Sequence, residues 1–191
     1  LRDAAHTFTT EAVANYFGRL ATNPEWMKYM GIISAEEAAR ISGDAFSAFR
    51  LQQLVFSRWA QVMYRFEKAM YANPDQDLNQ LWWDTVERYQ MMKKPGGRNM
   101  PDWATKIHVA LYPCYYHNYL LGELLASQFS EYITANVVKG NTQEDMKAIG
   151  EFFQTKVFMP GMRYEWNDMI EIAMGEKLTA KYYASQVVGV K

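Results

Sequence analysis

Several features are scarce or missing in this sequence, and each scarcity excludes a class of protein. Among 191 residues there is one cysteine, Cys114, which excludes an intrachain disulfide and a zinc site built from several cysteines. Lys and Arg number 20 and Asp and Glu 21, for a net charge of -1. Without a basic excess we expect no nucleic-acid partner. No apolar run approaches the roughly 18 residues of a membrane-spanning helix, so we also expect no membrane span.

Apolar residues, by contrast, are plentiful. They make up 49% of the chain, and the aromatic residues include 10 Phe, 6 Trp and 13 Tyr. This composition supplies far more burial potential than a disordered chain carries. The length suits one domain with a sizeable core, or a substantial piece of a larger one. Because residue 1 is Leu and no signal-peptide pattern follows it, we expect the chain to be a fragment.

Helix signals dominate the first half of the chain. The stretch Ser34-Ala35-Glu36-Glu37 has the form of a capping box, in which the Ser hydroxyl and the Glu side chain satisfy free backbone N–H groups. The helix that begins there carries apolar residues at spacings of three and four, which predict one buried stripe: Val55, Trp59, Val62, Phe66 and Met70. Asn73-Pro74 ends this helix.

Further helices follow to the end of the chain. Asp75 or Asp77 is expected to cap a helix that ends near the Pro-Gly loop at 93–97. Four more helices are predicted, from near Pro113 to about Val138, from a cap at Thr142–Asp145 to about Phe158, at 163–174 and at 179–187. Alternating strand patterns are rare, so the chain is predicted to be all-α, with long helices packed against each other.

Three clusters have residue types that could carry chemistry. The first is Glu11, a carboxylate among apolar neighbours on a predicted helix. Such a residue most often faces solvent, but a buried ionised carboxylate needs a cation or hydrogen bonds, so Glu11 is also a candidate metal ligand. His6 lies five residues earlier, off the i, i+4 spacing that places two ligands on one helical face, and is expected at the surface.

The second and third clusters lie around the start of the last long helix. Lys106 and His108 occupy a strand-like stretch and could face one ligand, although a lone His is more often structural. Tyr112, Tyr116 and Tyr119 are spaced four and three, which predicts one helical face. Core packing explains most such stripes, but three phenols instead of three phenyl rings also imply hydroxyls that need partners or face a cavity.

Taken in order, these clusters resemble the C-terminal half of the angiotensin-converting-enzyme family of zinc peptidases, with a weaker likeness to the thimet oligopeptidase group. The resemblance covers the whole chain and rests on an ordered set of short motifs. They are Glu11-Ala12 followed by Asn23-Pro24-Glu25-Trp26, Trp82-Trp83 followed by Tyr89-Gln90, Lys106-x-His108, and Tyr116-x-x-Tyr119. Met91 replaces a family Gly, and one extra residue separates His108 from Tyr116.

The resemblance implies a fold, a cofactor and a set of roles. The fold would be the multi-helix C-terminal portion of a zincin-type peptidase, with residues 1–191 as a single helical unit of a larger catalytic domain. Glu11 would be the third zinc ligand beside two histidines. Lys106 and Tyr116 would hold the C-terminal carboxylate of a peptide substrate, as in a peptidyl-dipeptidase. His108 and Tyr119 would donate hydrogen bonds to the substrate carbonyl and the developing oxyanion.

Three departures from the family pattern accompany the resemblance. Asn15 stands where the family has an acidic residue four positions after the zinc Glu, so the groups that orient a zinc-bound His differ. Asn118 replaces an Arg between the two tyrosines, which places an activating chloride in doubt. No His-Glu-x-x-His occurs in the 191 residues. We therefore expect the N-terminal half of the same protein to be a partner, and the fragment alone to be inactive and without zinc.

One alternative function stays open from the sequence. An upstream half without the zinc motif would make the protein a non-catalytic helical module that binds peptides or a partner. The presence or absence of His-Glu-x-x-His in the upstream sequence distinguishes the two. The resemblance favours a periplasmic or secreted setting, and the single cysteine does not contradict it.

Overall fold

The computed structural model describes residues 3–140 and 143–189, and every regular element in these ranges is helical. The predicted all-α class is confirmed. The elements are α1 (Thr7–Ala21), α2 (Pro24–Tyr29), α3 (Ala35–Ala72), α4 (Leu78–Gln90), η1 (Asp102–Thr105), α5 (Ile107–Ala110), α6 (His117–Asn136), α7 (Gln143–Phe152), the π-helical η2 (Phe153–Phe158), η3 (Gly161–Arg163), α8 (Trp166–Met174) and α9 (Lys181–Val188). Within the same ranges, no helix combines the length and apolar character needed to cross a membrane.

The chain divides into two compact units, and each is described by itself. The first unit comprises Leu1–Arg50 and Leu121–Lys191, and the second comprises Leu51–Leu120. Helices α3 and α6 contribute residues to both. The expectation of a single helical unit within a larger catalytic domain stays a prediction.

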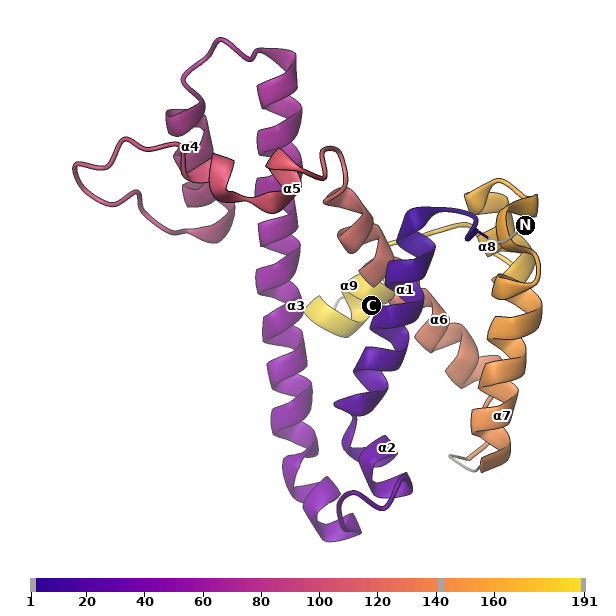
Figure 1. The fold of residues 1–191 in the computed structure, drawn as a ribbon. Coiled ribbons are helices and arrows are strands. Elements are labelled where there is room, and N and C mark those ends of the chain that lie inside the picture. The colour runs from indigo at the N-terminus through magenta and orange to yellow at the C-terminus, as the bar shows by residue number, and fades with distance from the viewer. Residues whose placement is uncertain (1–2, 141–142, 190–191) are drawn as a thin grey trace. The chain divides into compact units, whose positions relative to one another are not determined.

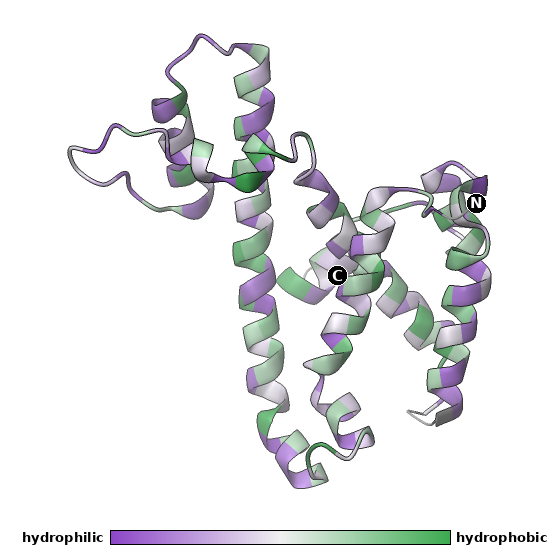
Figure 2. Cartoon of the chain, viewed as in Figure 1, coloured by the Kyte–Doolittle hydropathy of each residue, from purple (hydrophilic) through white to green (hydrophobic). Residues whose placement is uncertain are grey.

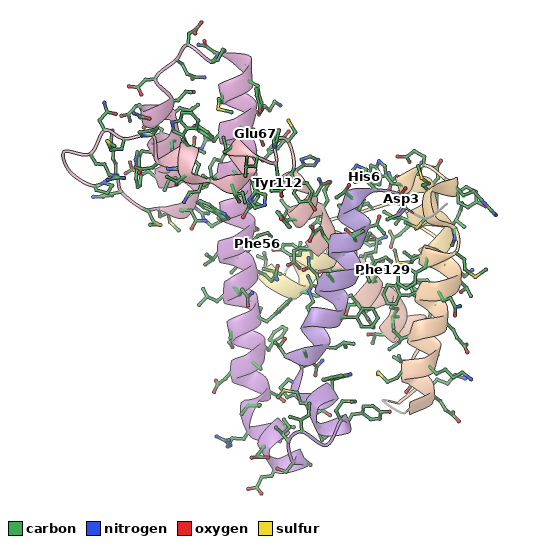
Figure 3. The ribbon with its side chains drawn as sticks, in the orientation of Figure 1. Asp3, His6, Phe56, Glu67, Tyr112 and Phe129 are labelled. Carbon is green, nitrogen blue, oxygen red and sulfur yellow. The ribbon has the colours of Figure 1, made fainter. Side chains whose placement is uncertain are left out.

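The first unit is built around a large apolar core. Its fully buried members come from α1, α6, α7, η2 and α8, and Phe129 of α6 lies among them (Figure 3). The ring centroid of Phe129 is 5.2 Å from that of Phe153, which in turn is 5.1 Å from Tyr16. Burial of aromatic side chains of this size contributes most of the stabilisation of a core. Helix α1 is therefore fixed by packing, and it crosses α6 at an angle (Figure 1).

The second unit has a smaller core between α3 and α4. Its buried residues are Val62, Met63, Phe66, Trp82, Val86 and Val109. Phe66 meets Trp82 edge-to-face at 5.1 Å, and α4 lies beside the C-terminal half of α3 (Figure 1). Hydrophobic and hydrophilic residues alternate along α3, as a helix with an apolar stripe requires (Figure 2). Within the predicted stripe Val55 is an exception, since it is 51% exposed.

Several predicted helix ends agree with the structure. The Ser34 Oγ accepts a hydrogen bond from the Glu37 N–H at 3.1 Å, and the Glu37 carboxylate accepts one from the Ser34 N–H at 2.8 Å, which is the predicted capping box. Asp77, one of the two residues proposed as a cap, accepts from the Gln80 N–H at 2.9 Å. Helix α3 ends at Ala72, directly before Asn73-Pro74. The predicted cap at Thr142, like Asn141, lies outside the described residues.

Helix α6 begins later than the sequence predicted. It starts at His117 and not near Pro113, because Cys114 has a φ of 57°, in the left-handed region. The Glu67 carboxylate accepts a hydrogen bond from the Cys114 N–H at 2.5 Å. Since left-handed backbone is costly for a residue other than Gly, this contact with the buried Glu67 of α3 stabilises the turn at Cys114.

Candidate active site

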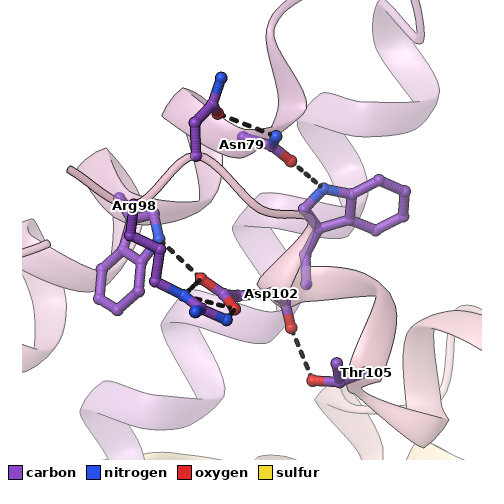
Figure 4. A network of polar contacts seen from close by, with 7 residues as sticks. Asn79, Arg98, Asp102 and Thr105 are labelled. Carbon is purple, nitrogen blue, oxygen red and sulfur yellow. Dashed lines mark hydrogen bonds and ion pairs between the residues drawn. The ribbon is translucent and has the colours of Figure 1, made fainter. Parts of the chain in front are cut away.

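A polar network holds the segment that leads to Lys106 (Figure 4). The Asp102 carboxylate accepts hydrogen bonds from the Arg98 Nε at 2.9 and 3.1 Å and from the Trp83 Nε1 at 3.1 Å. The hydrogen bonds from Arg98 hold the pKa of the Asp102 carboxyl below its ordinary value, and the bond from Trp83 acts in the same direction. The network ties the loop after α4 to α4 itself, so Lys106 follows a fixed segment.

A second part of the same network fixes η1. The Trp103 Nε1 donates to the Asn79 Oδ1 at 3.1 Å, and the Asn79 Nδ2 donates to the Asn99 Oδ1 at 3.0 Å (Figure 4). The Trp103 carbonyl then accepts from the Lys106 N–H at 3.1 Å. Lys106 therefore directly follows η1 and caps the four-residue helix α5. The stretch of Lys106 and His108, predicted to be strand-like, is helical at His108.

Lys106 is half-buried and forms no close ion pair among the described residues, although its charge acts on the nearby Asp102 carboxylate. Its Nζ lies 5.6 Å from the ring centroid of Trp59 and 5.9 Å from that of Trp82. Aromatic faces attract a cation without neutralising it. The two indole rings thus leave the Lys106 ammonium able to contact an incoming anion.

His108 and Tyr119 form a hydrogen-bonded pair. The His108 Nε2 lies 2.9 Å from the Tyr119 hydroxyl oxygen, and the two rings meet edge-to-face at 5.4 Å. Both side chains are half-buried, so neither is enclosed in an aliphatic core. Which of the two groups donates depends on the tautomer of the imidazole. One hydrogen, from either the Nε2–H or the phenol O–H, therefore lies between the two groups and forms the bond of the pair.

Tyr116 joins this pair to Lys106 through Trp59. Its ring lies 4.9 Å from His108 and 5.1 Å from Tyr119, and its hydroxyl oxygen accepts a hydrogen bond from the Trp59 Nε1 at 2.7 Å. Burial raises the pKa of the Tyr116 phenol above its ordinary value, while the hydrogen bond from Trp59 opposes that rise. The structure thus brings four predicted site residues, Lys106, His108, Tyr116 and Tyr119, into one cluster of contacts.

The predicted tyrosine stripe is wrong in its geometry. Tyr112 and Tyr116 precede α6, so the three tyrosines do not share a helical face, and Tyr112 is 57% exposed. Tyr115, which the spacing did not single out, packs against Tyr119 at 5.1 Å instead. Trp59 was also missed, because its place in an apolar stripe concealed its role as a hydrogen-bond donor. The presence of Trp where Phe would fill the stripe equally well was the available signal.

Glu11 lies in the first unit, on the face of α1 that approaches α6. It is half-buried, so the more frequent solvent-facing interpretation does not describe it. Gly122 allows the approach: a Cβ atom at Gly122 would lie 2.7 Å from the Glu11 Cβ and 3.2 Å from the Ala12 backbone nitrogen. Contacts this close exclude every side chain larger than hydrogen without movement. The backbone of α1 at Glu11 is therefore set by direct contact with α6.

His6 has a structural role at the start of the same helix. Its Nδ1 accepts a hydrogen bond from the Phe8 N–H at 3.3 Å, and its ring lies 4.8 Å from that of Phe8. The residue is half-buried and not at the surface as predicted. An imidazole nitrogen that accepts from the backbone caps α1 in the way that Ser or Asp usually does.

The described residues do not supply a complete zinc site. Catalytic zinc takes three protein ligands, and no group of three or more His, Cys, Asp or Glu side chains in ranges 3–140 and 143–189 is arranged to hold a metal. A half-buried carboxylate on a rigid helix, such as Glu11, suits one ligand position. The role of Glu11 as a zinc ligand stays a prediction.

Comparison with known proteins decides the family. The family model described as Angiotensin-converting enzyme, peptidase M2, matches residues 1–183. The chain belongs to the angiotensin-converting enzyme family. No curated protein sequence matches it. Membership in this family implies a zinc metallopeptidase lineage, as the resemblance implied.

A solved structure supports the fold of this family member. The structure described as "BsuCP Crystal Structure" is similar, with a TM-score of 0.73, 20% sequence identity, and coverage of 98% of this chain and 42% of that one. At this identity the likeness shows the fold alone. The chain spans less than half the length of that protein, so it corresponds to a portion of a larger fold.

In this member of the angiotensin-converting enzyme family, Asn118 lies between the two tyrosines as a buried amide. Its Oδ1 has no hydrogen-bond partner among the described residues. The position therefore carries no positive charge, in contrast to the Arg that the resemblance led us to compare with it.

Proposed function

We propose that this chain is the C-terminal part of a zinc-dependent peptidase of the peptidyl-dipeptidase type. In the proposal, Glu11 supplies the third zinc ligand, and zinc, when bound, supplies the Lewis acid that polarises the scissile carbonyl. Lys106 and Tyr116 bind the substrate's C-terminal carboxylate. His108 and Tyr119 donate hydrogen bonds to substrate oxygens. The zinc-binding histidines belong to the proposed N-terminal half.

The cluster around Lys106 is the observation that carries the proposal. An ammonium group that forms no close ion pair among the described residues and a phenol lie against the same indole, with a hydrogen-bonded His–Tyr pair beside them. A carboxylate is the anion that such a pair of donors suits, because a charged and a neutral donor satisfy its two oxygens. A peptide with a free C-terminus presents this carboxylate at a fixed distance from its last peptide bonds.

The His108–Tyr119 bond constrains how these two residues can donate hydrogen bonds to substrate oxygens. When His108 is protonated on Nε2, it donates to the Tyr119 oxygen and the phenol can donate to a substrate oxygen. In the other tautomer the phenol donates to Nε2 and cannot do so. Donation by Tyr119 therefore requires the Nε2-protonated tautomer, and His108 donates to a substrate oxygen itself when that oxygen replaces the Tyr119 hydroxyl at Nε2. A donor aimed at a developing oxyanion typically contributes roughly 100- to 1000-fold to the rate.

The test of the proposal is Lys106→Ala in the complete protein, assayed with a tripeptide that has a free C-terminus and with its C-terminal amide. Loss of a charge-assisted hydrogen bond should raise the KM of the free peptide by about 10- to 100-fold and leave the amide unchanged. Equal effects on both peptides would contradict the carboxylate role. A complete protein that turns over neither peptide, and whose upstream half lacks the His-Glu-x-x-His motif, would instead support the non-catalytic binding module.

A further inference from the structure

Trp59 contacts both members of the proposed carboxylate clamp. Its Nε1 donates to the Tyr116 hydroxyl at 2.7 Å, and its ring faces the Lys106 ammonium at 5.6 Å. The indole is itself fixed, because it meets Trp82 edge-to-face at 5.9 Å in the core between α3 and α4. A single rigid group therefore sets the positions of two donors.

The direction of the hydrogen bond determines what Tyr116 can do. An indole N–H can only donate, so the Tyr116 oxygen must be the acceptor. The phenolic proton of Tyr116 then points away from Trp59 and toward a different acceptor. Without the indole N–H, the hydroxyl would be free to rotate and to point its lone pairs, instead of its proton, at an incoming carboxylate.

We propose that Trp59 is a positioning residue of the carboxylate clamp, which orients the Tyr116 hydroxyl as a donor and supports the Lys106 ammonium beside it. The inference rests on the proposed function and adds a residue to it. Trp59 acts through Tyr116 and Lys106 and touches neither zinc nor the scissile bond. Its loss should therefore change the binding of the free C-terminus and leave the chemical step unaltered.

The experiment is Trp59→Phe in the complete protein, which keeps an aromatic ring and removes the N–H. For the free-carboxylate tripeptide, we expect KM to rise about 5- to 10-fold, because one neutral hydrogen bond is lost. The Kd, measured by calorimetry on zinc-free protein so that no turnover occurs, should rise by the same factor. Neither kcat nor the affinity for the amidated peptide should change. The matched control is Trp166→Phe, which removes an indole N–H from the first unit, where the ring packs against Phe8.

Two further measurements separate orientation from simple packing. In a double-mutant cycle, Tyr116→Phe should raise the Kd less in the Trp59→Phe background than in the wild type, because the hydroxyl that it removes is no longer oriented as a donor. The phenol pKa of Tyr116, followed by NMR with 13C-labelled tyrosine, should rise in Trp59→Phe because the N–H no longer stabilises the phenolate. If Trp59→Phe folds poorly, the Trp59 indole N–H resonance compared between wild type and Tyr116→Phe reports on the same bond.

The outcomes also distinguish this inference from the proposed function. A wild-type protein that binds free and amidated peptides equally has no carboxylate clamp, which overturns both. A wild-type preference that Trp59→Phe leaves intact, with additive effects in the cycle or an unshifted indole resonance in Tyr116→Phe, overturns the role of Trp59 alone. A preference lost together with the rise in pKa supports both.

Discussion

The two units hold their candidate site residues by different kinds of contact. In the first unit, Glu11 is set by helix packing, where α6 approaches α1 so closely that only a glycine fits at 122. In the second unit, Lys106 and His108 follow an irregular loop that is held by side-chain hydrogen bonds to Asp102 and Asn79. Packing resists displacement at every pH and ionic strength, whereas an exposed polar network weakens when its carboxylate is protonated. The comparison predicts that the two units respond to different perturbations.

The largest expected effect is on the hydrogen-bonded pair of the second unit. Tyr119→Phe keeps the ring and removes one hydroxyl, so packing should change little while the donor to the substrate is lost. In the complete protein we expect kcat to fall by roughly 100-fold or more, with little change in KM. Steady-state kinetics with a free-carboxylate tripeptide measure both constants.

The control for this variant is Tyr115→Phe, which removes a hydroxyl from the ring that packs against Tyr119. It should leave kcat near the wild-type value. If Tyr119→Phe changes only the melting temperature, Tyr119 is a packing residue, and the pair has no part in catalysis.

The next effect concerns the helix contact of the first unit. Gly122→Ala would place a Cβ 2.7 Å from the Glu11 Cβ, and overpacking of this kind costs about 1–3 kcal/mol, more than the up to about 1 kcal/mol that Ala gains over Gly in a helix. We therefore expect a net loss of stability in denaturant unfolding. The zinc affinity of the complete protein should fall with it, because the residue displaced is the proposed ligand.

A second glycine serves as a control, because its replacement by Ala should raise stability and not lower it. Gly18 lies in α1, the same helix as Glu11, and a Cβ there would meet nothing within 4 Å. Gly18→Ala should stabilise the protein by up to about 1 kcal/mol and leave zinc affinity unchanged. Should both substitutions stabilise, helix α1 yields to α6 and the packing account of Glu11 is incorrect.

Helix signals in the sequence predicted most of the fold because they are local. The capping box at Ser34, the cap at Asp77 and the stop at Asn73-Pro74 depend on residues within one turn of each other, and all three are confirmed. The late start of α6 depends instead on the contact between Glu67 and the Cys114 N–H, 47 positions apart. No periodicity in the sequence reveals such a contact.

The candidate site shows the same limit. The sequence motifs identified Lys106, His108, Tyr116 and Tyr119. The structure places the last three in mutual contact and Lys106 against Trp59, which bonds Tyr116, although their roles stay predictions. The motifs did not identify Trp59, because a tryptophan in an apolar helical stripe is indistinguishable from a core residue until its N–H is seen to have a partner. A hydrogen bond made by a residue that also packs in the apolar core is therefore the feature of a site that sequence patterns most easily miss.

The smallest expected effect concerns the polar network of the second unit. Hydrogen bonds from Arg98 are the main reason that the pKa of the Asp102 carboxyl is below its ordinary value. The ionised carboxylate therefore stabilises the folded loop above the pKa of Asp in the unfolded chain, and this stabilisation is lost as the pH falls through the pKa of the folded state. Acid should therefore increase amide hydrogen exchange in the segment 91–106 before it affects α1 and α6. Asp102→Asn should show the faster exchange already at neutral pH, with a modest rise in KM because Lys106 follows the loosened segment.

Hydrogen-exchange mass spectrometry resolves the two regions in one experiment, and Asp84→Asn, which removes a carboxylate that accepts from Gln80 within α4, is the control. If the segment 91–106 exchanges at the same rate in wild type and Asp102→Asn, the loop is held by the packing of Trp103 and not by its polar contacts, and the contrast between the two units disappears.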